Sequence, residues 1–276
     1  MSCTVVIATY RGANYLSHII RSLGAQSFKE FETIFVVKPS GDGTVSLVED
    51  LSNDLNLEKR IILQKEGNVT KALQLGVEKA RGDVILFTDD DAILPGNWLK
   101  KHLDLYQEPR IGAVSGNILN YDLHQRRVLP LETSAPLVRI YRKLFRPIID
   151  RPHKLFVDYR QGVYVTWDYR IVAGRGIPSS PCLSLPCRGV NLSFRTMALK
   201  NIDFPEHPSL RRYLLWEPYL GVQVVVKGWK ALYDPSIVVY HIIRQSLSRT
   251  SERKEVRFER NVMRKMLGKY LTNNAV

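Results

Sequence analysis

The stretch DVILFTDDD, residues 83–91, places an apolar run directly before three adjacent carboxylates. The run at 84–88 is rich in large apolar residues, which is typical of a buried strand in a parallel sheet. The three aspartates repel one another unless a cation or solvent screens them. A hard divalent ion such as Mg²⁺ takes oxygen ligands and is often shared between carboxylates and substrate phosphates. The alternative is a polar turn in which Asp91 caps a short helix toward Trp98.

Strands and helices alternate through the residues that lead up to this triplet. Apolar, β-branched runs predict strands at 4–8, 31–37, 60–63 and 83–88, and helical spacing predicts helices at 15–23, 44–51 and 70–80. This alternation predicts an α/β fold with a doubly wound, mostly parallel central sheet that is flanked by helices. Ligands of such sheets bind at the carboxyl ends of the strands. The loops at 8–14, 38–44 and 89–97 are therefore expected to line one crevice.

The rest of the chain is less regular and ends in a basic helix. We expect an extended segment at 159–173, a loop at 174–188, a helix at 214–227 that stops at Gly228, short strands at 231–233 and 237–240, and a helix at 251–271.

The net charge of +13 is concentrated in two segments. Residues 137–160 hold seven Lys or Arg against two acids, and residues 242–276 hold nine against three. In both segments the charges accompany an apolar stripe, which includes Phe145 in the first and Met263 and Leu267 in the second. Basic amphipathic helices of this kind can lie in the headgroup region of an anionic membrane. The alternative is a stripe that packs on the protein core and leaves the charges in water.

The composition is that of an ordinary globular protein, and no apolar run approaches the roughly 20 residues that a membrane span needs. The first residues lack the basic region and cleavage site of a signal peptide, and are expected to form a strand. The three cysteines, Cys3, Cys182 and Cys187, are too few for a disulfide framework, and they do not form a zinc site. We therefore expect the protein in the cytoplasm, at the cytoplasmic face of the membrane.

Four motifs, taken in order, resemble those of family-2 glycosyltransferases. They are TVVIATYR at 4–11, GDGT at 41–44, KALQLG at 71–76 followed by ARGDVILFTDDD at 80–91, and GVNLSFR at 189–195. In the family these are the opening strand, the end of the second loop, the helix and strand that lead to the D-x-D motif, and the G-x-N-x-x-x-R block. The resemblance implies the GT-A fold. It also implies an inverting transfer of a sugar from a nucleotide-diphosphate sugar, with Mg²⁺ or Mn²⁺ as cofactor.

The resemblance further implies roles for particular residues. Glu217 stands eleven residues before the helix-ending Gly228, where the family has its catalytic carboxylate, and is expected to take the proton of the acceptor hydroxyl. An ordinary helix N-terminal glutamate is the alternative. The expected metal ligands are Asp89, Asp91 and His241, and the expected donor-binding residues are Thr9, Tyr10, Arg11, Lys71, Asp89 and Asp90, with Arg244 and Arg249 as further candidates. A structural histidine and an exposed helical lysine are the alternatives for His241 and Lys71.

The implied organisation has a nucleotide-sugar-binding half at 1–120, an acceptor-binding and catalytic half of the same domain at 121–240, and a basic tail or helix at 241–276. The expected partners are the donor, a lipid-linked or glycan acceptor and an anionic membrane surface, without a specific nucleic acid. Lys38 departs from the family, because an acid that contacts the nucleotide base usually stands there. We therefore assign Lys38 no role in recognising the base.

Two other functions fit parts of the pattern. A sugar-phosphate nucleotidyltransferase shares the α/β core, but it needs a G-x-G-T-R loop after the first strand, where this chain has ATYRG at 8–12. A non-catalytic α/β protein that binds nucleic acid or membrane through its basic segments stays open as the alternative. It leaves the acidic triplet and Glu217 without an explanation.

Overall fold

The four apolar runs that precede the aspartate triplet form neighbouring parallel strands. They stand in the order β3-β2-β1-β4, and they are β1 (Cys3–Tyr10), β2 (Phe31–Lys38), β3 (Lys59–Leu63) and β4 (Val84–Asp89). The register places Ala8 beside Asp89 and Tyr10 beside Lys38. The carboxyl ends of these strands therefore meet at one edge of the sheet.

The structure is a computed structural model that describes residues 1–129, 145–174, 177–211, 214–244 and 253–274. Beyond β4 the sheet continues through β11, β6, β12 and β10, with β5 on β12 and β7 on β6. β11 runs antiparallel to both of its neighbours, whereas β6 and β12 run parallel to each other. The bounds are β5 (Ala92–Ile93), β6 (Ile111–Asp122), β7 (Arg127–Val128), β10 (Cys182–Leu183), β11 (Leu192–Arg195) and β12 (Lys230–Ile242), and a separate hairpin pairs β8 (Val163–Val165) with β9 (Ile171–Ala173).

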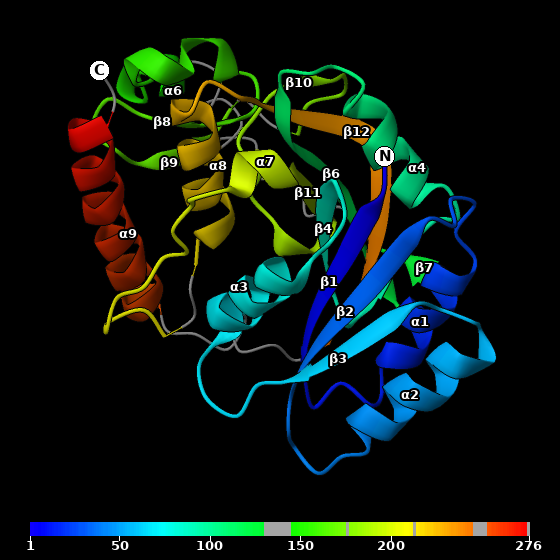
Figure 1. Ribbon diagram of the computed structural model, residues 1–276. Helices are drawn as coiled ribbons and strands as arrows, with labels where there is room; N and C mark the ends of the chain where they lie inside the picture. Colours follow the sequence, from blue (N-terminus) through cyan, green and yellow to red (C-terminus); the bar gives the residue numbers. More distant parts are fainter. Residues whose placement is uncertain (130–144, 175–176, 212–213, 245–252, 275–276) are drawn as a thin grey trace.

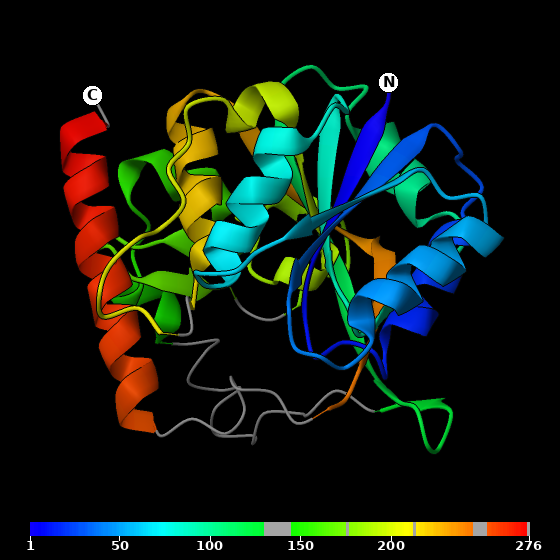
Figure 2. The same ribbon diagram turned by 60° about the horizontal axis from the view of Figure 1, so that its bottom comes forward.

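Helices cover both faces of the sheet, as the alternation of strands and helices predicts (Figures 1 and 2). Alternate residues of β1 divide the core, because Val5 and Ile7 pack toward one face and Val6 toward the other. The first face carries α1 (Leu16–Gly24), α2 (Thr44–Asp54) and α4 (Trp98–Leu105). The second carries α3 (Val69–Lys79), α7 (Thr196–Leu199), α8 (Trp216–Val226) and η1 (Lys154–Tyr159), with α9 (Arg253–Asn274) outside α8. Two further short helices are α6 (Arg146–Ile149) and η2 (Gly189–Asn191).

The C-terminal helix α9 uses its apolar stripe for packing. Met263, Leu267 and Leu271 are buried in the same core as α8. The apolar stripe of α9 therefore packs on the protein core, which is the alternative to membrane binding, and it is not available to a membrane. The other basic amphipathic stretch, at 137–149, lies mostly outside the described residues.

The segment at 231–240 forms one long strand instead of the two short strands that the sequence predicts. β12 runs through Asp234 and Pro235, and its register on β6 shifts between Asp234 and Val238. Proline has no backbone N–H to donate to a neighbouring strand, which interrupts the pairing without ending the strand. Similarly, the extended segment predicted at 159–173 contains β8 and β9, but it begins in η1.

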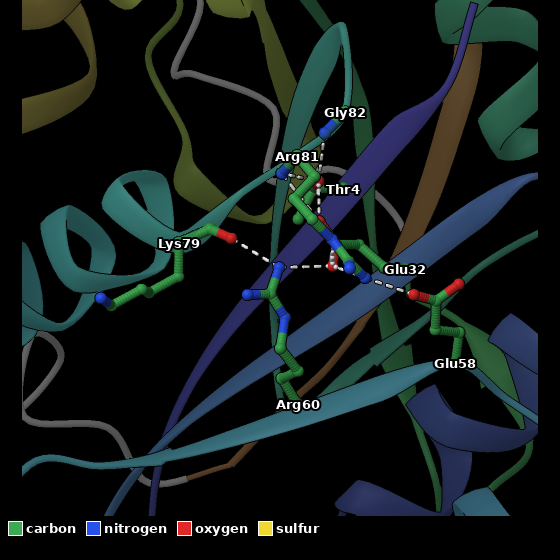
Figure 3. A network of polar contacts seen from close by, with 7 residues as sticks. All are labelled: Thr4, Glu32, Glu58, Arg60, Lys79, Arg81 and Gly82. Atoms are coloured by element: carbon green, nitrogen blue, oxygen red, sulfur yellow. Dashed lines mark hydrogen bonds and ion pairs between the residues drawn. The ribbon is translucent and has the colours of Figure 1, made fainter.

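A buried carboxylate ties the amino ends of the strands together (Figure 3). Glu32 on β2 accepts hydrogen bonds from Thr4 Oγ1 at 2.8 Å, from the Arg60 guanidinium at 2.5 Å, and from the backbone and side chain of Arg81 at 2.8 and 3.1 Å. Burial alone would raise the pKa of Glu32, but these hydrogen bonds together hold it below its usual value. This network lies at the opposite ends of the parallel strands from the aspartate triplet.

Replacing Glu32 by glutamine is expected to lower the free energy of unfolding by about 2–3 kcal/mol, because hydrogen bonds to a charged acceptor are lost in a buried place. Urea unfolding at pH 7 measures this change. The control is Glu58→Gln, which removes only an exposed pair with Arg81 and should cost less than about 1 kcal/mol. Because the folded pKa is lowered, the contribution of Glu32 is present above its unfolded pKa and is lost as the pH falls through the folded value. Equal stability of the two variants would contradict this role.

Candidate active site

The aspartate triplet and His241 meet where β12 returns to the end of β4. Ala92 on β5 pairs with His241, and the backbone N–H of Ile242 donates to the carbonyl of Asp91 at 2.9 Å. His241 Nε2 lies 3.1 Å from Asp91 Oδ1 and 3.8 Å from Asp89 Oδ2. The structure thus brings together the three predicted metal ligands, and one ligand atom from each lies within 4.8 Å of the others.

The chemistry of these atoms fits a divalent cation. Asp91 is only 3% exposed, and its Oδ1 is buried beside His241 Nε2. Asp89 keeps 51% of its side chain open, which leaves room for further ligands from a substrate. Desolvation by the surrounding protein and the nearby Asp91 carboxylate raise the pKa of Asp89, and a cation would remove that repulsion. Two carboxylates with one imidazole suit Mn²⁺, and also Mg²⁺ with water completing its shell.

Asp90 faces away from this cluster and holds the loops in place. It is 2% exposed, and its Oδ2 accepts a hydrogen bond of 2.6 Å from Thr9 Oγ1. Its Oδ1 lies 2.6 Å from the Arg244 guanidinium. A side chain at Gly12 would place its Cβ 2.7 Å from Asp90 Oδ2, so glycine is required where this loop crosses. Thr9 and Asp90 are both predicted to bind the donor. In the structure both are buried, and they hold the loop after β1 and Arg244 against the end of β4.

Arg244 is the cation that the structure adds to this cluster. Its Nε lies 2.6 Å from Asp91 Oδ2, in addition to its contact with Asp90. Its guanidinium also lies over the Tyr15 ring, 5.0 Å from the centroid. The sequence suggests Arg244 only as one of two candidates after His241, and the other, Arg249, lies outside the described residues.

The remaining predicted donor-binding residues differ in their surroundings. Tyr10 and Arg11 are exposed at the carboxyl end of β1, where the Arg11 and Lys38 cations lie 5.2 and 5.7 Å from the Tyr10 ring. Two of the three loops predicted to line one crevice are linked here, because Asp42 accepts from the backbone N–H of Ala13. Lys71 Nζ lies 3.5 Å from Gln74 Oε1 of its own helix, as expected of an ordinary helical lysine.

Glu217 occupies the first turn of α8, where its charge interacts with that of Asp89. The backbone N–H groups of Glu217 itself and of Gly189 donate to its carboxylate. Burial, with a smaller contribution from the negative charge of Asp89, raises the pKa of Glu217 to about 7. A carboxyl group with a pKa near neutrality is suited to taking up a proton and releasing it again. The same position satisfies the alternative role, because an acidic side chain is favourable in the first turn of a helix.

Comparison with known protein families identifies the chain. The family described as Glycosyl transferase family 2 matches residues 4–170. The chain belongs to glycosyltransferase family 2. Among the relatives of this family-2 glycosyltransferase is TarS of Staphylococcus aureus, a poly(ribitol-phosphate) β-N-acetylglucosaminyltransferase, which is 31% identical over 102 residues. The matched part is 36% of this chain and 18% of TarS, so the relative is much the longer protein.

Solved structures show that this family-2 glycosyltransferase has the GT-A fold. TarS residues 1–349 in complex with UDP-GlcNAc superpose with a TM-score of 0.60 at 17% identity, covering 91% of this chain and 61% of that one. A mannosyltransferase from Pyrobaculum calidifontis in complex with GDP-Man and Mn²⁺ gives a TM-score of 0.59 at 16% identity, covering 89% and 58%. The predicted fold class is therefore confirmed.

The G-x-N-x-x-x-R block of this glycosyltransferase has a supporting role that its sequence does not reveal. Asn191 accepts from Trp98 Nε1 at 2.9 Å, and its Nδ2 donates to the carbonyls of Asn117 and Ile237 at 2.8 and 3.0 Å. These bonds tie η2 to β6 and β12, and η2 begins at Gly189, the residue that contacts Glu217. The buried, hydrogen-bonded Asn191 therefore positions η2 and, with it, Gly189 beside Glu217.

Proposed function

We propose that this glycosyltransferase moves a sugar from a nucleotide-diphosphate sugar to an acceptor hydroxyl with inversion at the anomeric carbon. In this proposal Glu217 is the general base, and Asp89, Asp91 and His241 hold Mg²⁺ or Mn²⁺. One observation carries the proposal. The Glu217 carboxyl has a pKa of about 7, and the negative charge of Asp89, a member of the three-ligand cluster, helps to raise that pKa.

The chemistry follows from this arrangement. Glu217 accepts the proton of the acceptor hydroxyl while that oxygen forms a bond to the anomeric carbon. The bond from the anomeric carbon to the diphosphate oxygen breaks on the opposite face, which inverts the configuration. A divalent cation at the cluster would stabilise the charge that develops on the departing diphosphate. Arg244 keeps Asp91 oriented, and the exposed Tyr10 and Arg11 contact the nucleotide part of the donor.

Donor hydrolysis tests this proposal without knowledge of the acceptor. We expect the protein to hydrolyse one nucleotide sugar of a panel of UDP-, GDP- and dTDP-sugars slowly in the presence of Mn²⁺ or Mg²⁺, and to lose this activity in excess chelator. A non-catalytic basic binding protein would release no sugar from any donor. Failure across the panel with both ions would reject the enzymatic proposal.

The pH dependence of turnover provides a further prediction. With saturating donor and metal, turnover is expected to rise about tenfold per pH unit below pH 7 and to level off above it, because Glu217 must be ionised to accept a proton. Initial rates of transfer or donor hydrolysis between pH 5.5 and 8.5 measure this profile. The residual activity of Glu217→Gln should lack this rising limb. A flat wild-type profile would remove Glu217 from the role of base.

The acceptor is proposed to be a glycan or a lipid-linked glycan at the cytoplasmic face of an anionic membrane. Support comes from the exposed Lys and Arg side chains of α9, at positions 254, 257, 260, 264, 265 and 269, and from the net charge of +13. Within the described residues, no helix is long and apolar enough to cross a bilayer. Since the apolar stripe of α9 is buried, the proposed contact is electrostatic.

Liposome flotation tests the membrane contact. The protein should bind vesicles with anionic lipid at low salt and dissociate as salt is added, because each Lys or Arg near the surface contributes about 1 kcal/mol. Changing Arg257, Arg260 and Lys265 to glutamine should abolish binding, whereas Arg264 is left in place because it bonds to Asp168.

The matched control for flotation changes the exposed Lys29, Lys79 and Lys100 to glutamine, which removes the same charge elsewhere on the surface. Equal loss of binding in both triple variants would show that net charge, and not α9, is responsible. A wild-type protein that stays in solution would exclude the membrane contact.

A further inference from the structure

A cavity of about 280 Å³ lies between the sheet and the β8–β9 hairpin. Its floor comes from β6 and β12, through Ser115 and Tyr233, and its sides come from Val163 and Ile177. Cys187 and Arg188, just before η2, complete the wall. Much of this cavity is built from residues after position 170, where the match to the family ends.

The cavity is separate from the metal cluster but lies next to the proposed base. None of Asp89, Asp91 and His241 lines it. Its wall residues Cys187 and Arg188 directly precede Gly189, whose N–H donates to Glu217. The charge of Glu217 affects the Cys187 thiol, and that of Arg188 affects Glu217, so the groups are close. A molecule in the cavity would therefore approach Glu217 from outside the cluster proposed to hold the donor diphosphate.

Two polar groups in the wall are available to a ligand. The Tyr233 hydroxyl is buried and has no hydrogen-bond partner among the described residues, which is costly unless a ligand or water supplies one. Burial raises the pKa of Tyr233 to about 12, so the hydroxyl keeps its proton and can donate it. Arg188 is exposed, and although its charge acts on Glu217, no carboxylate of the described residues forms an ion pair with it. The wall thus offers a hydroxyl and a cation beside the apolar Val163 and Ile177.

We propose that this cavity binds one sugar or polyol unit of the acceptor, and that this unit carries a phosphate or carboxylate group that meets Arg188. The inference rests on the proposed function, because it places the acceptor hydroxyl beside Glu217. Ligand pockets for drug-sized molecules span about 300–1,000 Å³, so a cavity at the lower end suits a single ring and excludes a long chain. Apolar walls with a few directed polar groups match a sugar, which has an apolar face and a polar edge.

Ligand-observed NMR at 150 mM NaCl tests this site independently of turnover, with glucose 6-phosphate and sorbitol 6-phosphate as probes. We expect saturable binding of at least one probe. Methyl β-D-glucopyranoside and inorganic phosphate, which each carry half of the chemistry, should bind at least about tenfold more weakly. Arg188→Gln should weaken the probe about tenfold and Tyr233→Phe about fivefold, as expected for the loss of a charged and a neutral hydrogen bond.

Ile177→Trp should abolish probe binding, because the exposed side chain at the edge of the cavity would fill it. The matched control is Met197→Trp, an equally exposed apolar position on α7 away from the cavity, which should bind the probe like the wild type. Melting temperatures show that each variant is folded.

Three outcomes would overturn the inference: no saturable binding of either probe, unchanged binding in Arg188→Gln and Ile177→Trp, or displacement of the probe by a tenfold lower concentration of dodecyl phosphate. The last would assign the cavity to a lipid phosphate. Donor hydrolysis by the wild-type protein is measured separately. A protein that hydrolyses its donor but fails the NMR test loses only the acceptor site, whereas one that hydrolyses no donor loses the proposed function.

Discussion

Replacing Glu217 by glutamine is expected to lower turnover by about 10²–10⁴-fold, the usual contribution of a general base. Glutamine has the shape of glutamate but cannot accept the proton of the acceptor hydroxyl. The backbone N–H of Gly189 can still donate to the side-chain oxygen, so the fold should be retained. Transfer rates at saturating donor and metal, with the acceptor that the protein uses, measure the effect.

Donor affinity distinguishes the loss of a base from general damage. Binding of the nucleotide should change little in Glu217→Gln, because the metal cluster and the exposed Tyr10 and Arg11 are untouched. Glu49→Gln, an exposed position on α2, provides the control and should behave as the wild type. Unchanged turnover, or a loss explained entirely by weaker donor binding, would move the role of base to another residue.

Replacing Asp91 by alanine is expected to reduce metal-dependent activity by more than about 10³-fold, because a charged ligand of the cluster is lost. Asp91 supplies the buried oxygen that faces His241, and its other oxygen orients Arg244. Both functions disappear in the variant. Mn²⁺ affinity measured by titration calorimetry should fall together with donor hydrolysis, which ties the loss to the metal.

Asp91→Ala could lose activity by unfolding, because Asp91 is buried and ion-paired with Arg244. Arg244 keeps its contact with Asp90, so a folded protein is expected. Asp91→Asn preserves the volume and serves as a second test, while Asp50→Ala, an exposed aspartate of α2, serves as the control. Full activity of either Asp91 variant, or of the wild type in excess chelator, would show that this cluster does not hold a required metal.

The sequence predicts those features that depend on local pattern. Alternation of strands and helices gives the parallel strands β1 to β4, and the family motifs direct attention to Asp89, Asp91 and His241, which the fold brings together. Helix spacing predicts α8 and its end near Gly228, which has the left-handed φ of 88° that favours glycine. The role of Glu217 stays a prediction, although its surroundings suit a base.

Features that depend on contacts between distant segments could not be predicted. Arg244 is 153 residues away from Asp91 and 154 residues away from Asp90, and no local sequence pattern predicts that it contacts them. The inward position of Asp90 depends on Thr9 and on the space left by Gly12. The cavity next to Glu217 likewise needs β12, the β8–β9 hairpin and the segment before η2 to be placed together.

The interrupted pairing of β12 has a consequence for where the strand would tolerate an insertion. Tyr233 pairs with Ser115 before the interruption and His241 with Asn120 after it, while residues 235–237 have no partner on β6. An insertion between Pro235 and Ser236 would lengthen this unpaired stretch and leave both flanks in register, while Ile237 keeps its buried position and its bond to Asn191. An insertion after Val239 would instead move His241 along the strand and turn its side chain to the other face. Length changes at Pro235 and Ser236 would thus leave Tyr233 at the cavity and His241 beside Asp91.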